Sequence, residues 1–133
     1  MSAIKSIRFI LGDQLSVSLA SLRDADPDHD LIVMAEPNSE ANYVAHHKQK
    51  IVFILSAMRH FAHELREKGF AVCYFDYENQ PTNSFSDALK LALKNHPVKH
   101  VIITEPGEWR IRTEIETWDK FGIVLDVRDD DRF

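Results

Sequence analysis

Side chains able to bind a ligand gather where two apolar runs of the sequence give way to glycine. The first run, Ile7–Leu11, ends at Gly12. The second, Val98–Thr104, is followed shortly by Gly107. Most polar groups around these runs accept hydrogen bonds, so they suit a polyol or a heterocycle with N–H donors better than a polyphosphate. The set comprises Asp13, Gln14, Glu36, Glu40, Glu105, Glu108 and Arg110.

Three common patterns of nucleotide binding and catalysis are missing from the sequence. It contains neither G-x-G-x-x-G nor G-x-x-x-x-G-K-[ST], which build the usual dinucleotide and triphosphate cradles. It also lacks a nucleophile-elbow sequence with the partners of a catalytic triad. The residues alone therefore favour a small-molecule-binding domain or an interaction domain, and they indicate no catalytic residue.

Each candidate also has a purely structural interpretation. Asp13 can hydrogen-bond its own backbone in a turn, which is about as plausible as ligand contact. Glu40 and Glu108 can complement helix N-termini, and for Glu108 this is the better interpretation. Arg110, taken alone, is expected to pair with a carboxylate rather than to contact a ligand.

Histidine pairs invite a metal-site interpretation that the rest of the sequence does not support. His46 and His47 are adjacent, and His60 and His63 have a spacing that shares one helix face. A zinc site needs three or four ligands, and no cysteine or aspartate cluster completes either pair. We expect solvated histidines on a helix.

Length and composition predict one compact domain over residues 1–133. The chain is 44% hydrophobic and 28% charged, which suits a single core. Its net charge of −5, with lysines and arginines interspersed among acids, lacks the basic footprint of a nucleic-acid binder. The lone Cys73 cannot form an internal disulfide, the N-terminus does not resemble a signal peptide, and no apolar run approaches the ~20 residues of a membrane span. We expect a soluble, cytoplasmic protein without a membrane partner, with Cys73 as a core side chain.

The apolar pattern predicts five strands separated mostly by helices. The first crossover, residues 16–30, is expected to be a short helix or irregular. This is the pattern of an α/β fold, a Rossmann-like doubly wound five-stranded parallel sheet of order 3-2-1-4-5 in a three-layer α/β/α arrangement. The expected strands are 7–11, 31–35, 70–75, 98–104 and 123–127, and the expected helices run from about 40 to 68, from 84 to 96 and from 109 to 121.

Several helix ends have recognisable signals. Gly69 and Gly122 are expected to adopt left-handed caps, which would bring Leu65 against Phe70 and repeat this contact between Trp118 and Ile123. Ser84-x-x-Asp87 resembles a capping box. The long helix should bury one stripe of side chains, formed by Val44, Ile51, Leu55, Met58, Ala62 and Leu65.

The predicted strand order places the candidate residues at one site. Strands one and four would be neighbours at the point where the chain reverses its direction of winding. The loops that carry Gly12 and Gly107 would then border the crevice where open α/β sheets bind ligands.

Five motifs, in this order along the chain, resemble the N-terminal domain of the deoxyribodipyrimidine photolyase-related proteins. This family comprises the iron–sulfur bacterial cryptochromes and (6-4) photolyases, and the resemblance covers essentially the whole chain. The motifs are Leu11-Gly12-Asp13-Gln14-Leu15, Glu40-Ala41-x-Tyr43-Val44-x-His46-His47-Lys48-x-Lys50-Ile51, Ser56-Ala57-Met58-Arg59-His60-Phe61-Ala62, Thr104-Glu105-Pro106-Gly107-Glu108-Trp109-Arg110 and Asp131-Arg132-Phe133.

The resemblance implies a light-harvesting domain of a blue-light flavoprotein that serves DNA photorepair or light sensing. Such a domain binds the antenna chromophore 6,7-dimethyl-8-ribityllumazine and passes excitation energy to a flavin. By motif, Gly12, Asp13 and Gln14 match the loop that approaches the lumazine, and Glu40 and Tyr43 match residues near its ring and chain. Carboxylates and an amide can bond ring N–H groups and ribityl hydroxyls, while Met34 and Tyr43 can cover the ring.

The resemblance also implies that the catalytic parts lie outside these 133 residues. FAD, a 4Fe-4S cluster and the DNA-binding surface belong to a helical C-terminal domain of the family. This chain alone is therefore not expected to repair DNA. Damaged DNA would be bound only by a full-length protein. The expected partner is the chain's own C-terminal FAD domain, against which Trp109 is expected to pack.

Two other functions remain open from the sequence. The same fold hosts other nucleotide- or flavin-binding modules. A pure interaction domain without a ligand is the second alternative, and it would expose an apolar patch where another domain packs.

Overall fold

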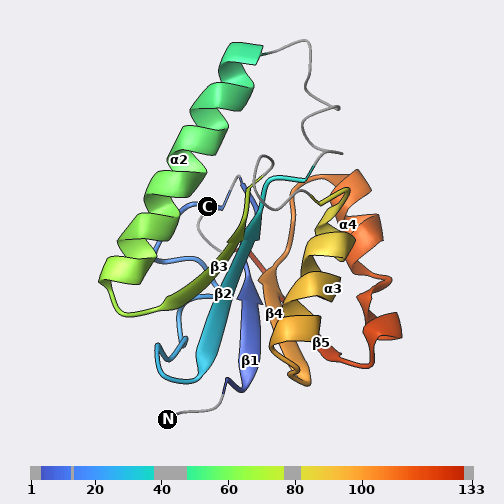
Figure 1. Cartoon of the computed structure of the whole chain (residues 1–133). Helices are drawn as coiled ribbons and strands as arrows, with labels where there is room; N and C mark the ends of the chain where they lie inside the picture. Colours follow the sequence, from blue (N-terminus) through green and yellow to red (C-terminus); the bar gives the residue numbers. More distant parts are fainter. Residues whose placement is uncertain (1–3, 13, 38–47, 77–81, 131–133) are drawn as a thin grey trace.

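The computed structural model describes residues 4–12, 14–37, 48–76 and 82–130, and it confirms the predicted sheet. Five parallel strands lie in the order β3-β2-β1-β4-β5, with β1 at the centre (Figure 1). Neighbouring strands pair in a continuous parallel register, for example Phe9 with Val33 of β2 and with Ile103 of β4. The strands are β1 (Ser6–Phe9), β2 (Asp30–Ala35), β3 (Ala71–Phe75), β4 (His100–Thr104) and β5 (Val124–Arg128).

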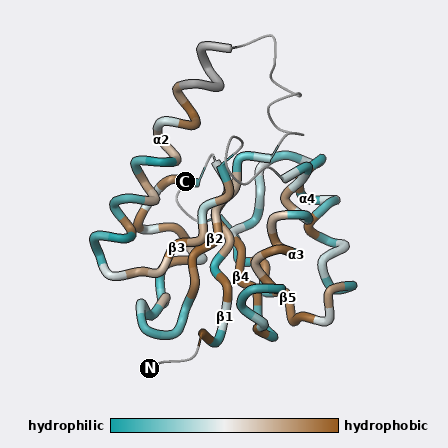
Figure 2. Tube along the Cα trace, in the orientation of Figure 1, coloured by the Kyte–Doolittle hydropathy of each residue, from teal (hydrophilic) through white to brown (hydrophobic). Residues whose placement is uncertain are grey.

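Helices cover both faces of the sheet, as a doubly wound fold requires. Helix α2 (Lys48–Glu67) lies on one face, and α3 (Phe85–Asn95) and α4 (Trp109–Ile115) lie on the other (Figure 1). The central strands are mostly hydrophobic, whereas hydrophobic and hydrophilic residues alternate along the helices and the turns are mostly hydrophilic (Figure 2). In the part of the chain that the structure describes, no helix combines the length and apolar character needed to cross a membrane.

The face under α3 and α4, here called the α3/α4 face, holds one continuous apolar cluster. Strand residues at alternate positions point to it, because successive side chains of a strand face opposite sides. Phe9 stands at its centre, edge-on to Phe85 at 6.0 Å and to Trp118 at 5.1 Å between ring centroids. Trp118 is fully buried, and its indole N–H donates to the Ser86 hydroxyl at 2.9 Å.

The sequence allowed either a short helix or an irregular segment for the first crossover, and the structure shows an irregular segment. Every residue from 14 to 29 is described, and this stretch forms turns rather than an α-helix. Polar contacts hold it against the sheet. The buried Arg8 of β1 donates to the Ser21 carbonyl at 3.1 Å and forms ion pairs with Asp24 and Asp30.

Two further side chains complete this cluster, which we call the Arg8 network. Arg128 of β5 donates to both carboxylate oxygens of Asp24, and the Ser6 hydroxyl donates to Asp30. The two arginines hold the pKa of Asp24 well below its ordinary value. The turns between β1 and β2 are thus fixed to β1 and β5 by charge.

The C-terminal end of α2 follows its sequence signal. Gly69 has φ 96°, the Phe70 amide donates to the Leu65 carbonyl at 3.1 Å, and the Gly69 amide donates to the Arg66 carbonyl at 3.0 Å. These are the two bonds of a Schellman motif, and Leu65 and Phe70 join the same apolar cluster as predicted. Of the predicted stripe, Met58, Ala62 and Leu65 are buried and Leu55 is half-buried. The side chains of Val44 and Ile51, and the predicted helix start near residue 40, lie outside the described part.

The start of α3 is confirmed, with one change in the capping partner. The Ser84 hydroxyl accepts from the Asp87 amide at 3.2 Å, as in a capping box. The Asp87 carboxylate accepts from the amide of Asn83, one residue before the cap, rather than from Ser84 itself. Both contacts still satisfy donors at the helix start.

The prediction of one continuous helix from Trp109 to Gly122 is wrong. Helix α4 ends at Ile115, and a separate 3-10 helix, η1, spans Trp118–Phe121. The Thr117 hydroxyl and amide both bond the Glu114 carbonyl, at 2.7 and 3.1 Å, and this local bonding competes with the next α-helical turn. Gly122 nevertheless has the predicted left-handed conformation, with φ 76°.

Candidate functional site

The carboxyl ends of β1 and β4 are tied together by the side chain of Gln14. Its amide oxygen accepts from the Leu11 amide at 3.3 Å, and its amide nitrogen donates to the carbonyls of Thr104 at 3.0 Å and Glu105 at 3.4 Å. Gln14 is only 2% exposed. It spans the predicted switch point and holds the loop after β1 against the end of β4. Asp13, beside it in sequence, lies outside the described residues.

The same loop lies directly on helix α2 at Gly12. A Cβ atom placed on Gly12 would stand 3.1 Å from the Met58 sulfur and 3.6 Å from Cγ2 of Ile54. The first distance is tighter than most packing contacts, so a side chain at this position would require Met58 to shift slightly, and Gly12 lets the loop approach α2 without that shift. By contrast, a Cβ atom on Gly107 would meet nothing within 4 Å.

Met34 lies beneath this contact rather than on the surface. It is fully buried on β2, in the apolar cluster that also contains Ile10 and Met58. Gly12 and Met34 therefore share the α2 side of the sheet, while the Gln14 side chain turns toward β4. Glu40 and Tyr43, the other two predicted ligand-binding residues, lie outside the described part of the chain.

A buried carboxylate marks the end of β2. The Glu36 side chain is 2% exposed and accepts hydrogen bonds from Nε and Nη2 of Arg59, both at 2.8 Å, and from the Tyr74 hydroxyl. Burial and the Glu36 carboxylate raise the pKa of Tyr74 far above its ordinary value, so the phenol remains protonated and donates. The hydrogen bonds to Glu36 also raise the pKa of Arg59. The sequence indicates Glu36 as a residue of the rim but reveals neither of its partners.

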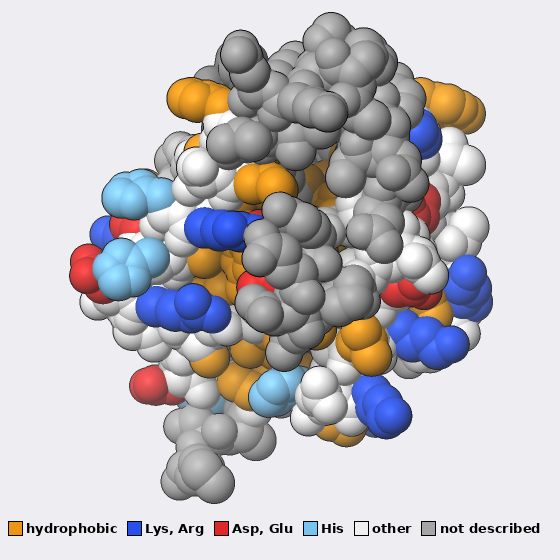
Figure 3. Space-filling model, turned by 45° about the horizontal axis from the view of Figure 1, so that its top comes forward, with side chains coloured by type: hydrophobic (Ala, Val, Ile, Leu, Met, Phe, Trp, Pro, Cys, Tyr) orange, Lys and Arg blue, Asp and Glu red, His pale blue; other side chains and the backbone are white. Residues whose placement is uncertain are grey.

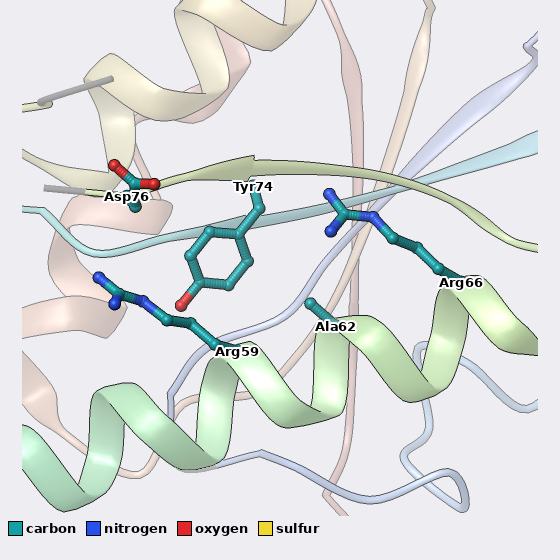
Figure 4. A pocket seen from close by; sticks show the side chains of 5 residues that line it. All are labelled: Arg59, Ala62, Arg66, Tyr74 and Asp76. Atoms are coloured by element: carbon teal, nitrogen blue, oxygen red, sulfur yellow. The ribbon is translucent and has the colours of Figure 1, made fainter. Parts of the chain in front are cut away.

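An open pocket of about 270 Å³ lies beside this cluster, between α2 and β3. Figure 4 shows Arg59 and Tyr74 reaching toward one another across it, with Arg66 directed toward β3. Arg66 donates to the Val72 carbonyl at 3.0 Å rather than to a carboxylate. The pocket is lined by Arg59, Ala62, Arg66, Tyr74 and Asp76.

The acids after β4 are paired with arginines. Arg110 forms an ion pair with Glu108 at 2.9 Å, which confirms the structural role expected for it, and Arg112 pairs with Glu105. Charges of both signs are interspersed on the right-hand flank of Figure 3, which brings the carboxyl edge of the sheet forward. Within this charged region Trp109 is 76% exposed.

The histidines of α2 are exposed, as expected. His63 contacts Glu67 one turn along the helix at 2.9 Å, and His60 is also at the surface. Among the residues that the structure describes, no three histidine, cysteine, aspartate or glutamate side chains gather into a possible metal site.

Comparison with known proteins identifies the family. The deoxyribodipyrimidine photo-lyase-related protein family matches residues 8–133. A (6-4) photolyase of Agrobacterium fabrum is 48% identical over 126 residues, which cover 93% of this chain and 25% of that protein. The chain thus spans about a quarter of the length of this relative. With a match over almost all of its sequence, the chain belongs to the deoxyribodipyrimidine photolyase-related protein family.

Proposed function

We propose that this chain is the antenna domain of a photolyase- or cryptochrome-type blue-light flavoprotein, and that it binds 6,7-dimethyl-8-ribityllumazine. The proposal rests on family membership and on the arrangement of the carboxyl edge of the sheet, where doubly wound folds bind ligands. In this role the domain absorbs light and passes the excitation energy to a flavin held elsewhere. It harvests light and does not catalyse repair.

The charge pairing at this edge is the observation that best supports a neutral, hydroxyl-rich ligand. Arg59, Arg110 and Arg112 each pair with a carboxylate, namely that of Glu36, Glu108 and Glu105 respectively. A phosphate-bearing ligand such as FMN or AMP would have to compete with these carboxylates. A ribityl chain and a ring with N–H donors instead need acceptors and an apolar surface.

The residues of the site divide into ligand contacts and supports. Asp13 and Glu40 would accept hydrogen bonds from the ligand, and Tyr43 would cover its ring. Gly12 lets the loop approach α2 and Gln14 fixes that loop to β4, so both shape the site through the backbone. Met34 is fully buried and would support the ring from below.

The flavin chemistry requires parts that we place in the remainder of a full-length protein. A 4Fe-4S cluster takes four cysteine ligands, whereas this chain has only Cys73. We assign FAD, the cluster and contacts with damaged DNA to a C-terminal domain. The exposed Trp109 offers that domain an apolar contact. A lone cysteine also agrees with a cytoplasmic location.

Fluorescence titration of the chain with 6,7-dimethyl-8-ribityllumazine tests the proposal. We expect saturable binding that Asp13→Ala and Glu40→Ala each weaken about tenfold or more, since each removes a hydrogen bond to a charged acceptor. Glu116→Ala removes an exposed acid at the end of α4 and should bind like wild type. Unchanged affinity in both site variants would refute the assignment of these residues.

A further inference from the structure

The Tyr74 phenol is hydrogen-bonded to a buried carboxylate beside an open pocket. Its hydroxyl donates to Oε2 of Glu36, a side chain that is 2% exposed. The Tyr74 ring is half-buried on β3 and lines the pocket between α2 and β3 (Figure 4). A small molecule in this pocket would lie against the ring, while the phenol proton faces a buried acceptor.

Arg59 and the sheet fix the Glu36 carboxylate in position. Nε of Arg59 donates to Oε2 and Nη2 to Oε1, both at 2.8 Å, and two parallel bonds of this kind set orientation as well as distance. The Glu36 amide donates to the Phe75 carbonyl at 2.9 Å, so the backbone is anchored to β3 as well. The acceptor and the phenol therefore need no rearrangement for a proton to pass between them.

The phenol holds its proton in the resting state and would release it on oxidation. Burial and the Glu36 charge raise the pKa of Tyr74 far above its ordinary value, so Glu36 does not deprotonate the resting phenol. A phenol that has lost an electron is a far stronger acid, and a base within hydrogen-bond reach then accepts its proton. Glu36 would become a neutral acid, while the guanidinium of Arg59 remains hydrated because that side chain is 46% exposed.

We propose that Tyr74 is a redox-active tyrosine, which gives one electron to an oxidant in the pocket while its phenol proton passes to Glu36. The oxidant is a photo-excited heteroaromatic ring. The products are a neutral tyrosyl radical, a protonated Glu36 and the one-electron-reduced ring. When one electron returns to the radical, Glu36 gives the proton back and both side chains regain their starting state. This activity goes beyond the proposed function and needs no bound lumazine.

Asp76 provides a matched control in the same pocket. It also brings a carboxylate to the lining, but the Tyr74 hydroxyl donates to Glu36. Glu36→Gln and Asp76→Asn therefore each replace one carboxylate by its amide, and only Glu36→Gln removes the base that accepts the phenol bond. Tyr74→Phe keeps the ring and removes the phenol.

The experiment uses tris(bipyridyl)ruthenium(III), formed by a laser flash, as the oxidant. This complex takes an electron but no proton, so the phenol proton must pass to Glu36 or to the buffer. Every variant also carries Trp109→Phe, because that indole is 76% exposed and would itself be oxidised. Formation of tyrosyl radical is followed by its absorption at several phosphate concentrations and constant ionic strength, and circular dichroism checks folding. The chain has two other tyrosines, and Tyr74→Phe measures their background.

We expect the parent chain to show a phase of radical formation whose rate does not depend on phosphate. Glu36→Gln should slow this phase about tenfold or more and make it depend on phosphate, whereas Tyr74→Phe should abolish it and Asp76→Asn should leave it unchanged. Absence of the phase in the parent chain, its persistence in Tyr74→Phe or an equal loss in Asp76→Asn would overturn the proposal. An unaltered phase in folded Glu36→Gln would also overturn it, and if that variant does not fold, the other two variants decide.

Discussion

Both faces of the sheet carry an apolar cluster, but they differ in the amount of buried charge. The α3/α4 face is an apolar cluster in which Phe9, Phe85 and Trp118 meet edge to face. On the other face, the first crossover buries Leu19 and Leu22 in the apolar cluster under α2 and is also bonded to β1 through the buried Arg8 and its carboxylates. At the carboxyl edge, a second set of polar contacts joins Gln14 to the end of β4.

The difference between apolar packing and buried polar contacts explains how the candidate site obtains its shape. Apolar packing is non-directional and tolerates substitutions that conserve volume. Buried polar networks are directional, and a partly satisfied network is worse than none. The loop after β1 therefore owes its path to specific donors and acceptors, while the α3/α4 face supplies most of the apolar core behind it. Substitutions in these regions should therefore differ in how far they lower the free energy of unfolding, and the buried Trp118 should be the most sensitive position.

The largest effect should come from Trp118→Ala on the α3/α4 face. Trp118 is fully buried, so truncation should reduce the free energy of unfolding by about 3–5 kcal/mol, measured by urea denaturation. Trp118→Phe keeps most of the packing and loses the bond to Ser86, so it should cost about half as much or less. A loss below about 1 kcal/mol in Trp118→Ala would show that this cluster is not the main source of stability.

Arg8→Met tests the buried ion pair between β1 and Asp30. It leaves the buried Asp30 carboxylate without its cation and should cost about 3 kcal/mol, although methionine is the more hydrophobic residue. Arg8→Met combined with Asp30→Asn should be more stable than Arg8→Met alone, because the unpaired charge is gone. If the single variant were as stable as wild type, the contrast between the two faces would fail.

Gln14→Glu replaces only the side-chain amide by a carboxylate. It therefore tests the hydrogen bonds that join the loop after β1 to the end of β4. Glutamate retains an acceptor for the Leu11 amide but cannot donate to the Thr104 and Glu105 carbonyls. We expect a loss of about 1–3 kcal/mol in the free energy of unfolding at pH 7, since a buried charge would face two carbonyl oxygens. Recovery of stability at low pH, where the new carboxyl is protonated and can donate, would sharpen the assignment; equal stability at both pH values with no loss would contradict it.

The smallest effect should come from Asp24, whose side chain is mostly exposed. Its pKa is lowered in the folded state, so its contribution is complete above its ordinary pKa of 3.8 and is lost as the pH falls below that value. After allowance for solvent screening, Asp24→Asn should cost about 1 kcal/mol or less at pH 7. Unfolding measured from pH 7 to pH 3 should show a smaller decline in the variant, and 1 M salt should narrow the difference. Parallel pH profiles would exclude Asp24 from this role.

Patterns that report burial and local backbone conformation predicted most of the fold. Apolar runs located all five strands, and their succession with helices predicted the order of a doubly wound sheet. Gly69 and Ser84 marked helix ends through local bonds. The break after α4 was missed because the Thr117 hydroxyl competes for one carbonyl in a way that apolar spacing does not reveal.

The site was less predictable, because its polar contacts join residues that are distant in sequence. Gln14 was identified as a site residue, but its two acceptors on the strand β4 side lie 90 and 91 residues away, so its role in joining the two strand ends was not visible. Glu36 and Arg59 are 23 residues apart, and the sequence contains no pattern that predicts their ion pair. A carboxylate placed before a proline at the end of an apolar strand was the available signal for Glu36.

Competition between ligands during fluorescence titration asks whether this chain binds lumazine selectively. The wild-type chain would first be saturated with 6,7-dimethyl-8-ribityllumazine and then challenged with FMN or AMP. We expect saturable lumazine binding that neither competitor displaces at comparable concentration, because Arg59, Arg110 and Arg112 are already paired with carboxylates. Absence of saturable binding, or ready displacement by FMN or AMP, would contradict the proposed function.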